Sequence, residues 1–190
     1  TFLRAAPTQF PGVPRVLNSL ATEKLRAFAM PFVSGKNPSL DMPRCVEELL
    51  ASWVTTNEAV SLGEIKSWQT LCAAIRGDSS FTQLAGDLES RRVAKVLSHG
   101  DFAPWNLRVD AAGKCVAIDW ERGEFPGVPG WDWFHYTIQP AILVRRMSGT
   151  KLRARAEALL CSPAFQSYAQ QTGIAGVERV LMLCYLRHVV

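Results

Sequence analysis

The sequence predicts an α+β fold in which a mainly helical region carries one small β-hairpin and follows a short segment of strands. Three changes in the spacing of apolar residues support this prediction. Two short apolar runs lie within residues 1–35, apolar residues recur at intervals of three and four from residue 43, and strand-like runs return between residues 97 and 119. At 190 residues, the chain can bury a core without disulfide or metal support.

The first segment predicts two strands joined by a turn. The strands and the turn occupy residues 13–20, 25–33 and 21–24. Proline, serine and glycine then interrupt the apolar pattern, which indicates an extended connector. We therefore expect a boundary near Gly35.

The remainder predicts helices around a second hairpin. We expect helices over residues 43–54, 65–75, 79–96, 131–146, 151–160, 163–171 and 177–190. Between them, residues 106–109 and 115–118 form two short strand-like runs around a turn at 110–113. Gly77 and Asp78 are suited to end one helix and cap the next.

Charge and cysteine content exclude some classes of protein. A formal net charge of +4 is too small an excess to indicate a nucleic-acid partner. The densest basic stretch has no interleaved aromatic residues, so we expect it on solvated helix faces. It comprises Arg145, Arg146, Lys151, Arg153 and Arg155.

The five cysteines are scattered and never occur as a C-x-x-C pair, which predicts neither a disulfide framework nor a zinc site. No apolar stretch is long enough for a membrane span. We therefore expect a reducing compartment, the cytoplasm, with no membrane partner.

One pattern carries chemistry: His99, Asp101 and Asn106 stand in the order His-x-Asp-x4-Asn. Random placement of the His, Asp and Asn residues of this chain would produce it roughly 0.002 times. A carboxylate can orient an attacking hydroxyl and accept its proton, and an amide oxygen can hold a divalent cation. Asp119 ends the apolar run 116–118, where a strand end would direct a second carboxylate toward the same cleft.

The stretch His-Gly-Asp-Phe-Ala-Pro-Trp-Asn at residues 99–106, followed by Ile-Asp-Trp-Glu at 118–121, resembles the aminoglycoside phosphotransferase and choline kinase superfamily. Its members share the protein-kinase-like fold. Protein kinases usually carry Arg where this chain has Gly100, and Phe-Gly where it has Trp120 and Glu121. The resemblance therefore implies a small-molecule substrate.

The resemblance implies that Asp101 is the catalytic base and that Asn106 and Asp119 hold Mg²⁺. It implies that His99 organises the catalytic loop, and that ATP or GTP donates the phosphate. Asp132 lies in a segment similar to one whose carboxylate braces that loop through backbone hydrogen bonds.

Residues 28–35 resemble the connector that joins the two lobes of the family and receives the adenine ring. The residues implied to line the base are Met30, Pro31, Phe32 and Val33. By the same resemblance, residues 1–35 are the end of the N-terminal lobe with its hinge connector, and residues 36–190 are the C-terminal catalytic lobe.

The chain departs from the family pattern before the connector. It has no Gly-rich phosphate loop there and no strand lysine with a helix glutamate, and Lys24 and Lys36 occupy other positions. We therefore expect the chain to be part of a longer protein, with only a remnant of the β-rich lobe. We do not expect strong catalysis from these 190 residues alone.

Four tryptophans surround the motifs, and core packing is favoured over a cage for a quaternary ammonium group. They are Trp105, Trp120, Trp131 and Trp133. Glu121 and Glu124 suit a pocket for an amine-bearing substrate and a solvated loop equally well. His135 and His188 lack the spacing of a metal pair, so we expect packed or surface side chains.

The sequence thus predicts an ATP- or GTP-dependent kinase that phosphorylates an alcohol hydroxyl of a small molecule, including one that bears an amine. The alternative is a non-catalytic kinase-like module that binds a nucleotide or another ligand, which the missing phosphate loop motivates. Metal-assisted hydrolysis has less support, because no third carboxylate or histidine accompanies the pair at ligand spacing.

Overall fold

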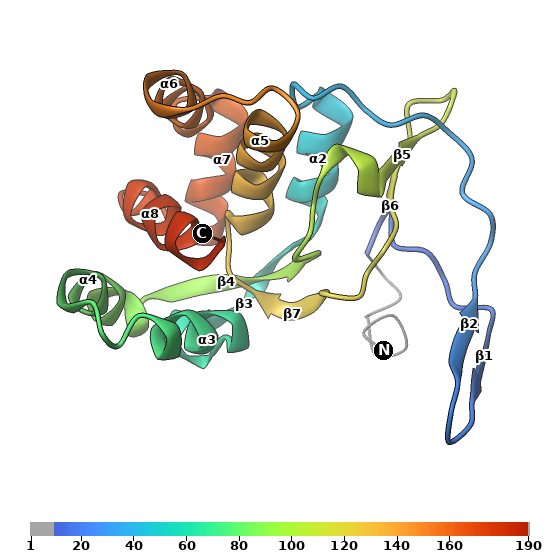
Figure 1. Ribbon diagram of the computed structural model, residues 1–190, viewed down its shortest axis with the longest axis horizontal. Helices are drawn as coiled ribbons and strands as arrows, with labels where there is room; N and C mark the ends of the chain where they lie inside the picture. The colour runs from blue at the N-terminus through green and yellow to red at the C-terminus, as the bar shows by residue number, and fades with distance from the viewer. Residues whose placement is uncertain (1–9, 190) are drawn as a thin grey trace.

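The computed structural model describes residues 10–189 and has an α+β fold, as the apolar spacing predicts. Residues 1–9 of the first predicted segment and Val190 of the last predicted helix lie outside the described residues. The ribbon in Figure 1 shows helices around a small central sheet and a β-hairpin that stands apart from them.

The separate hairpin consists of β1 (Asn18–Ala21) and β2 (Arg26–Ala29), which pair antiparallel. The Thr22 N–H donates to the Leu25 carbonyl oxygen at 2.8 Å and closes the turn. The predicted hairpin is confirmed, but its strands are shorter than the apolar runs. Proline lacks the N–H that a ladder needs, and Pro14 and Pro31 flank the paired residues.

An irregular connector follows β2 and is fastened to the main body. Lys36 and Val109 exchange two backbone hydrogen bonds of 3.0 and 2.8 Å. The Asp41 carboxylate accepts hydrogen bonds from Arg145 and Arg155, whose guanidinium groups lower the pKa of Asp41 to about 2. Two members of the basic stretch therefore hold the connector: Arg155 lies on α6 (Gly149–Leu160), whereas Arg145 lies in the turn after α5 (Trp131–Leu143) and not on a helix. The boundary near Gly35 stays a prediction.

The next helices are α2 (Arg44–Ser52), the short 3₁₀ turn η1 (Leu62–Glu64), α3 (Lys66–Ala74) and α4 (Ser79–Glu89). Asp78 is the N-cap of α4, and its Oδ1 accepts the Phe81 N–H at 3.3 Å. This cap follows the sequence prediction.

Two of the predicted helices are too long, because they include parts of a sheet. Strands β3 (Val54–Ser61), β4 (Arg92–Ser98) and β7 (Glu124–Gly127) form an antiparallel sheet in the order β3-β4-β7. The helix predictions at residues 53–54 and 90–96 are therefore wrong. The central strand β4 buries Val93, Val96 and Leu97, and an apolar run buried on both faces cannot be separated from a helix by spacing alone.

The second predicted hairpin is confirmed. After the 3₁₀ turn η2 (Pro104–Asn106), β5 (Leu107–Val109) pairs with β6 (Cys115–Ala117). In the turn, Asp110 Oδ1 accepts the N–H groups of Ala112 and Lys114, both at 2.9 Å.

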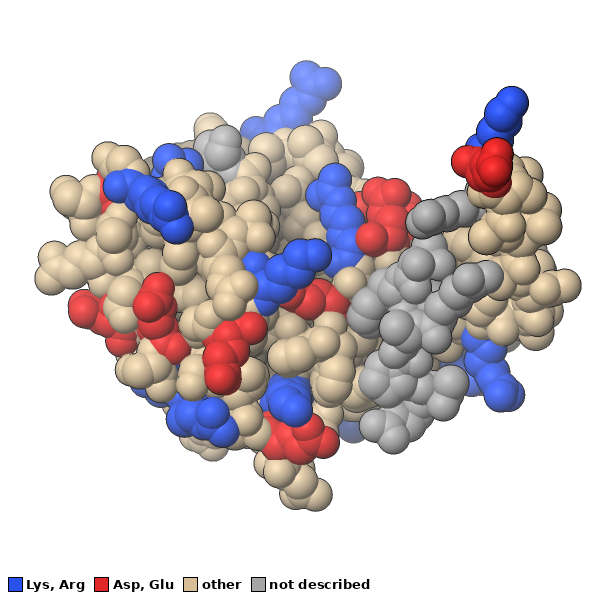
Figure 2. Space-filling model, turned by 90° about the horizontal axis from the view of Figure 1, so that it is seen from below, with Lys and Arg blue, Asp and Glu red and all other residues tan. Residues whose placement is uncertain are grey.

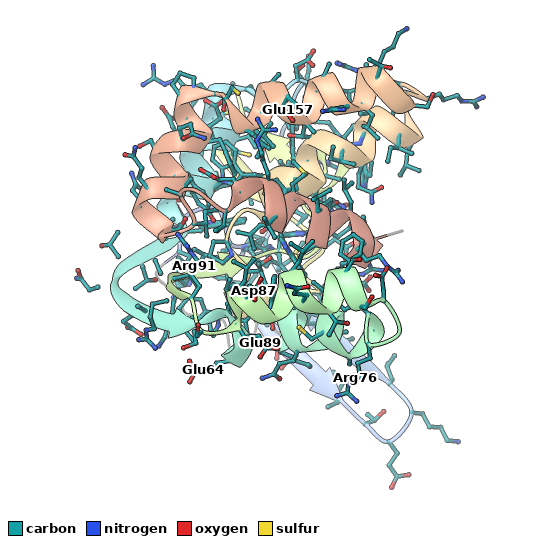
Figure 3. All side chains as sticks on the ribbon, turned by 90° about the vertical axis from the view of Figure 1, so that its left-hand side faces the viewer. Glu64, Arg76, Asp87, Glu89, Arg91 and Glu157 are labelled. Atoms are coloured by element: carbon teal, nitrogen blue, oxygen red, sulfur yellow. The ribbon has the colours of Figure 1, made fainter. Side chains whose placement is uncertain are left out.

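The C-terminal helices lie within a few residues of their predicted bounds. They are α5 (Trp131–Leu143), α6 (Gly149–Leu160), α7 (Pro163–Thr172) and α8 (Glu178–Val189). In Figure 1 these helices and α2 lie on one side of the sheet, whereas α3 and α4 lie on the other. Arg91, labelled in Figure 3, donates to the carbonyl oxygens of Gly173 and Ala175, both at 2.8 Å, and ties the start of β4 to the α7–α8 loop.

The surface carries mixed charge. Figure 2 shows acidic and basic side chains interspersed on one face. Within residues 10–189, no helix is long and apolar enough to span a membrane.

The buried aromatic core gives a first prediction. Trp133 is 1% exposed and packs within 5.6 Å of the Phe165 ring and 5.3 Å of the Tyr168 ring, measured between ring centroids. Trp133→Ala should lower the free energy of unfolding by about 3–5 kcal/mol, measured by urea denaturation. Phe32→Ala, at a position 93% exposed, should change it by less than about 0.5 kcal/mol. Equal effects of the two substitutions would contradict the packing described.

Candidate active site

The residues of the sequence motif form a loop, 99–106, between β4 and β5; we call it the motif loop. Gly100 has a φ of 76°, and a Cβ there would lie 2.5 Å from the Arg122 carbonyl oxygen, so only glycine fits. Phe102 is wholly buried, and its ring lies 5.4 Å from that of Trp53. One side of the motif loop is therefore anchored in the core.

His99 links the motif loop to the end of β6. The ring is buried, its Nδ1 accepts the Asp101 N–H at 3.3 Å, and its Nε2 therefore carries the proton and donates to the Ile118 carbonyl oxygen at 2.8 Å. Burial lowers the pKa of His99, although the carboxylates of Asp132, Asp101 and Asp119 oppose this effect. The neutral His99 ring thus makes two hydrogen bonds, one within the motif loop and one to the residue after β6.

Asp132 braces the motif loop from the first turn of α5. Its Oδ2 accepts the His99 N–H at 2.7 Å, and its Oδ1 accepts the Gly100 N–H at 3.1 Å. Burial raises the pKa of Asp132, while these N–H groups favour the ionised form. The first turn of a helix also stabilises a negative charge. The carboxylate of Asp132 thus accepts two backbone hydrogen bonds at the start of the motif loop.

Asp101 projects from the motif loop with a side chain that is 32% exposed. Its Oδ2 accepts from Asn106 Nδ2 at 3.0 Å, and its Oδ1 lies 2.9 Å from His135 Nε2. Among residues 10–189, each oxygen of the Asp101 carboxylate has one protein partner, which leaves it a further lone pair. The group is therefore held in one orientation and is still accessible to an incoming hydroxyl.

Asn106 and Asp119 are brought together by backbone pairing. Leu107 faces Ala117 in the β5–β6 ladder, and the Ile118 N–H extends the ladder by donating to the Asn106 carbonyl oxygen at 2.8 Å. Asp119 follows at once with a φ of 65°, a left-handed conformation that few non-glycine residues adopt. This turn ends the strand beside the motif loop.

The donor atoms at this point suit a hard divalent cation. Asn106 Nδ2 is committed to the Asp101 carbonyl oxygen and carboxylate, and its Oδ1 accepts no hydrogen bond from the described residues. The exposed Asp119 carboxylate likewise has no hydrogen-bond or ion-pair partner among residues 10–189. No group of three or more His, Cys, Asp or Glu in that range could hold a metal. Mg²⁺, however, commonly binds one or two protein oxygens together with water and phosphate.

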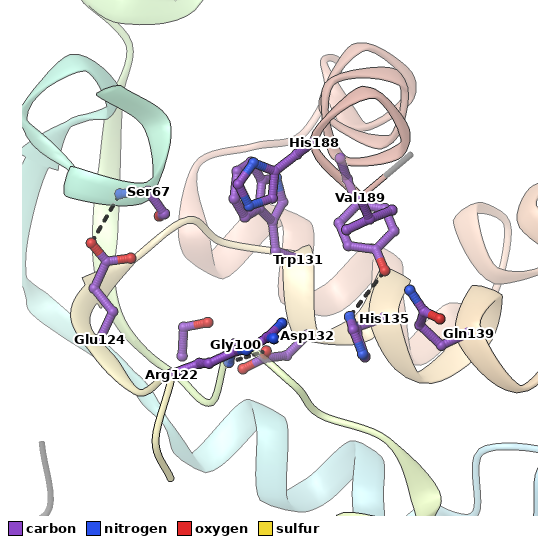
Figure 4. Close-up of a pocket in the computed structure, with 12 residues that line it drawn as sticks. Ser67, Gly100, Arg122, Glu124, Trp131, Asp132, His135, Gln139, His188 and Val189 are labelled. Carbon is purple, nitrogen blue, oxygen red and sulfur yellow. Dashed lines mark hydrogen bonds between the residues drawn. The ribbon is translucent and has the colours of Figure 1, made fainter. Parts of the chain in front are cut away.

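A cavity of about 370 Å³ lies beside the motif loop (Figure 4). Gly100, Asp132 and His135 line it on one side, and Trp131 and His188 lie across it. The Trp131 and His188 rings stack with centroids 4.7 Å apart. The cavity thus combines an aromatic wall with polar groups. Asp101 does not itself line this cavity but contacts His135, which does.

The other sequence candidates around the site have distinct positions. Glu124 lines the cavity, and its Oε1 accepts the Ser67 N–H at 3.0 Å near the start of α3. Glu121 is exposed, with an oxygen 4.0 Å from Arg122 Nε. Glu124 therefore has a structural partner as well as access to the cavity. The exposed Glu121 lines a neighbouring hollow together with Glu124 and His188.

The tryptophans mostly follow the core-packing prediction. Trp120 is buried, and its Nε1 donates to the Ala117 carbonyl oxygen at 2.8 Å. Trp133 is also buried, and Trp105 is half-buried. Trp131 is the one of the four that lines the cavity.

The four residues implied to line a nucleotide base lie on the connector after β2. Met30 and Val33 are half-buried, whereas Pro31 and Phe32 are exposed. The connector runs on to Lys36, which pairs with Val109 of β5. The structure therefore brings this segment toward the strand that follows the motif loop, without a described contact to Asp101.

Sequence reasoning missed His135, Tyr185 and Arg122. It gave His135 no role, yet this residue lies three positions after Asp132 on α5, so it faces the motif loop one turn further along. Tyr185 hydrogen-bonds His135 Nδ1 at 3.1 Å, and Arg122 lines the cavity beside Gly100. The i, i+3 spacing could have identified His135, but no local signal identifies Tyr185, fifty residues away in sequence.

A scan of protein-family models finds no match to this chain, and no curated protein matches it in a sequence search.

The Asp132 brace predicts a difference between two aspartates that each accept two backbone N–H groups. Asp132→Ala should lower the free energy of unfolding by about 2–4 kcal/mol, because the His99 N–H stays buried without a partner. Asp110→Ala should cost less than about 1 kcal/mol, because water replaces the lost acceptor in an exposed turn. Urea denaturation compares them, and a cost at Asp132 no greater than that at Asp110 would disprove the brace.

Folding stability should fall as the pH drops below about 6.5. Burial lowers the pKa values of His99, His135 and His188 below the ordinary value of 6.5. The unfolded chain therefore binds more protons than the folded chain in this range. Stability rises with pH by up to about 1.4 kcal/mol per unit for each of the buried residues His99 and His135, and by less for the exposed His188.

Urea denaturation between pH 8 and 5 measures this slope, to which the buried Asp132 carboxyl contributes with the opposite sign because its pKa is raised. A free energy of unfolding that rises from pH 7 to 5 would contradict buried, neutral rings at His99 and His135. His188→Gln should reduce the slope and leave the remainder to the other two.

Proposed function

We propose that the chain carries the base and metal half of a kinase that transfers a phosphoryl group from ATP or GTP to an alcohol hydroxyl of a small molecule. One observation carries the proposal. Asp101, Asn106 and Asp119 gather at the junction of the motif loop and the β5–β6 hairpin, where each offers oxygen atoms that are not fully used by the protein.

In the proposed reaction, the acceptor hydroxyl donates a hydrogen bond to Asp101 and attacks the terminal phosphorus. The new phosphorus–oxygen bond forms as the bond to the leaving nucleoside diphosphate breaks, and the leaving oxygen retains that electron pair. The hydroxyl proton passes to Asp101. His99 and Asp132 keep the motif loop in place throughout, because their hydrogen bonds involve the backbone and not the reacting atoms.

Asn106 Oδ1 and the Asp119 carboxylate would hold Mg²⁺, which would neutralise charge on the phosphate oxygens. The oxygen-only donor pair favours Mg²⁺ over softer metals. Asn106 also donates to Asp101, so the same side chain aligns the base with the metal ligand.

We assign the chain to the kinase-like fold and to the resembled superfamily as part of the same proposal. The α+β architecture, the motif loop between strands and the hairpin that ends at Asp119 support it. The connector at Met30 to Val33 is the proposed position of the nucleotide base, supported by its tether from Lys36 to β5. The proposed location remains the cytoplasm.

The cavity beside the motif loop is the proposed acceptor site. It is lined by Arg122 and Glu124 as well as by the stacked Trp131 and His188 rings. Neighbouring charges of both signs and an aromatic wall suit a polar molecule of modest size, and Glu124 can pair with an amine on it.

The non-catalytic module is retained as a second candidate on one observation. Lys24 and Lys36 do not replace the phosphate-orienting lysine, because Lys24 lies in the β1–β2 turn and Lys36 pairs with β5 through its backbone. This candidate expects Mg²⁺-dependent nucleotide binding with neither transfer nor hydrolysis.

The catalytic prediction concerns Asp101. In the complete protein with Mg²⁺ and ATP, Asp101→Asn should lower turnover by about 10²–10⁴, because the amide no longer accepts the proton. Phosphorus NMR follows the conversion of ATP into ADP and a phosphomonoester over a panel of hydroxylated amines, sugars and alcohols. Asp110→Asn, in the neighbouring hairpin turn, is the matched control and should retain full turnover.

Two outcomes would contradict the proposed function. Unchanged turnover in Asp101→Asn excludes this carboxylate as the base. Nucleotide binding by the complete protein without any transfer or hydrolysis favours the non-catalytic module.

A further inference from the structure

The catalytic base of the proposed function has a second partner that the sequence motif does not contain. His135 lies on α5, and its Nε2 is 2.9 Å from Asp101 Oδ1. The His135 side chain is 10% exposed, so the contact is shielded from water on the histidine side. The two residues are 34 positions apart, which makes the pair a feature of the fold.

The position of the His135 proton follows from its other partner. The Tyr185 hydroxyl, on α8, lies 3.1 Å from His135 Nδ1. Burial raises the pKa of Tyr185, so its hydroxyl keeps its proton at neutral pH. Gln139, one turn along α5 from His135, lines the cavity beside this hydroxyl. Tyr185 can therefore donate its proton to His135 Nδ1, the ring nitrogen that does not face Asp101.

The ring of His135 is neutral and carries its proton on Nε2. Burial lowers the pKa of His135, and Arg122 lowers it further, whereas Asp101 opposes both effects. If the proton were on Nδ1, the lone pair of Nε2 would face a carboxylate oxygen at 2.9 Å, which is repulsive. With Nδ1 as the acceptor from Tyr185, Nε2–H donates to Asp101 without conflict.

Asp101 is consequently held at both oxygens by donors from different parts of the chain. His135 holds Oδ1, and Asn106 Nδ2 holds Oδ2 at 3.0 Å. Two donors fix the rotation of the carboxylate about its Cβ–Cγ bond. The remaining lone pairs then point in set directions toward the acceptor hydroxyl.

We propose that His135 is a positioning residue for Asp101 and that Tyr185 sets the tautomer in which it works. The proposal rests on the proposed function, because it assigns a role within that reaction. His135 gains and loses no proton in the cycle. It keeps the Nε2–H bond while Asp101 receives the proton of the attacking hydroxyl.

The experiment combines NMR of the histidine ring with kinetics on the complete protein. In two-bond proton–nitrogen spectra, His135 should have its proton on Nε2 and an unprotonated Nδ1. Tyr185→Phe removes the hydroxyl that donates to His135 Nδ1, so the His135 ring should become a mixture of its two tautomers. This substitution should lower kcat about tenfold and leave the KM for ATP unchanged. Tyr168→Phe is the matched control, since its hydroxyl is buried near by but bonds Gly130 instead.

Substitutions of His135 itself separate positioning from packing. His135→Gln retains an amide N–H that can reach Asp101, so kcat should stay within about threefold of the unchanged protein. His135→Leu keeps the volume and loses the donor, so kcat should fall about 10- to 100-fold. If His135 had only a packing role, His135→Gln and His135→Leu would not differ in this way. A kcat retained in His135→Gln and lost in His135→Leu therefore supports the positioning role.

The outcomes separate this proposal from the proposed function. An active protein with the His135 proton on Nδ1, or with equal losses in Tyr185→Phe and Tyr168→Phe, overturns the role of His135 alone. Equal kcat in His135→Gln and His135→Leu also overturns it. Absence of any phosphoryl transfer by the unchanged protein contradicts the proposed function, and the role of His135 within it falls too.

Discussion

The candidate site depends on one buried interaction, the pair of hydrogen bonds from the N–H groups of His99 and Gly100 to the carboxylate of Asp132. These bonds fix the start of the motif loop against the first turn of α5. Once the loop is fixed there, the His99 ring reaches the Ile118 carbonyl oxygen and joins the loop to the β6 end. The position of the Asp101 carboxylate, on the same loop, depends on these hydrogen bonds.

The three aspartates around the loop differ because their surroundings differ. Asp132 is buried and accepts two backbone N–H groups, which suits the proposed structural role. Asp101 is one-third exposed and held by two donors, which suits the proposed role of base. Asp119 is exposed at a strand end and has no protein partner among the described residues, which suits a metal ligand. The three residues are all aspartates, so the differences between their proposed roles come from burial and hydrogen-bond partners.

The sequence predicted much of the helical region, because amphipathic spacing, the Asp78 cap and the C-terminal glycine and proline breaks are local signals. It failed at β4, a central strand whose apolar residues are buried on both faces of the sheet, and at β7, which is only four residues long. Strand pairing between distant segments determines both, and no local pattern reports it. The β1–β2 and β5–β6 hairpins could be predicted from the sequence, because a short turn joins the two strands of each hairpin.

The same division applies to the site. Asp101, Asn106 and Asp119 were found from spacing within 21 residues, and Asp132 was found by resemblance. His135 and Tyr185 were not, because their significance arises only when α5 and α8 pack beside the motif loop.

The most direct test of the site is the position of a bound cation. Mn²⁺ substitutes for Mg²⁺ at oxygen sites and broadens NMR signals of nearby nuclei, so Mn²⁺ with ADP can be added to the complete protein in small amounts. The account predicts that the Asn106 side-chain amide and the Asp119 backbone amide broaden first, with Asp110 in the same hairpin affected much less. Broadening centred elsewhere, or equal at Asp110 and Asp119, would contradict the assignment of Asn106 and Asp119 as the metal ligands.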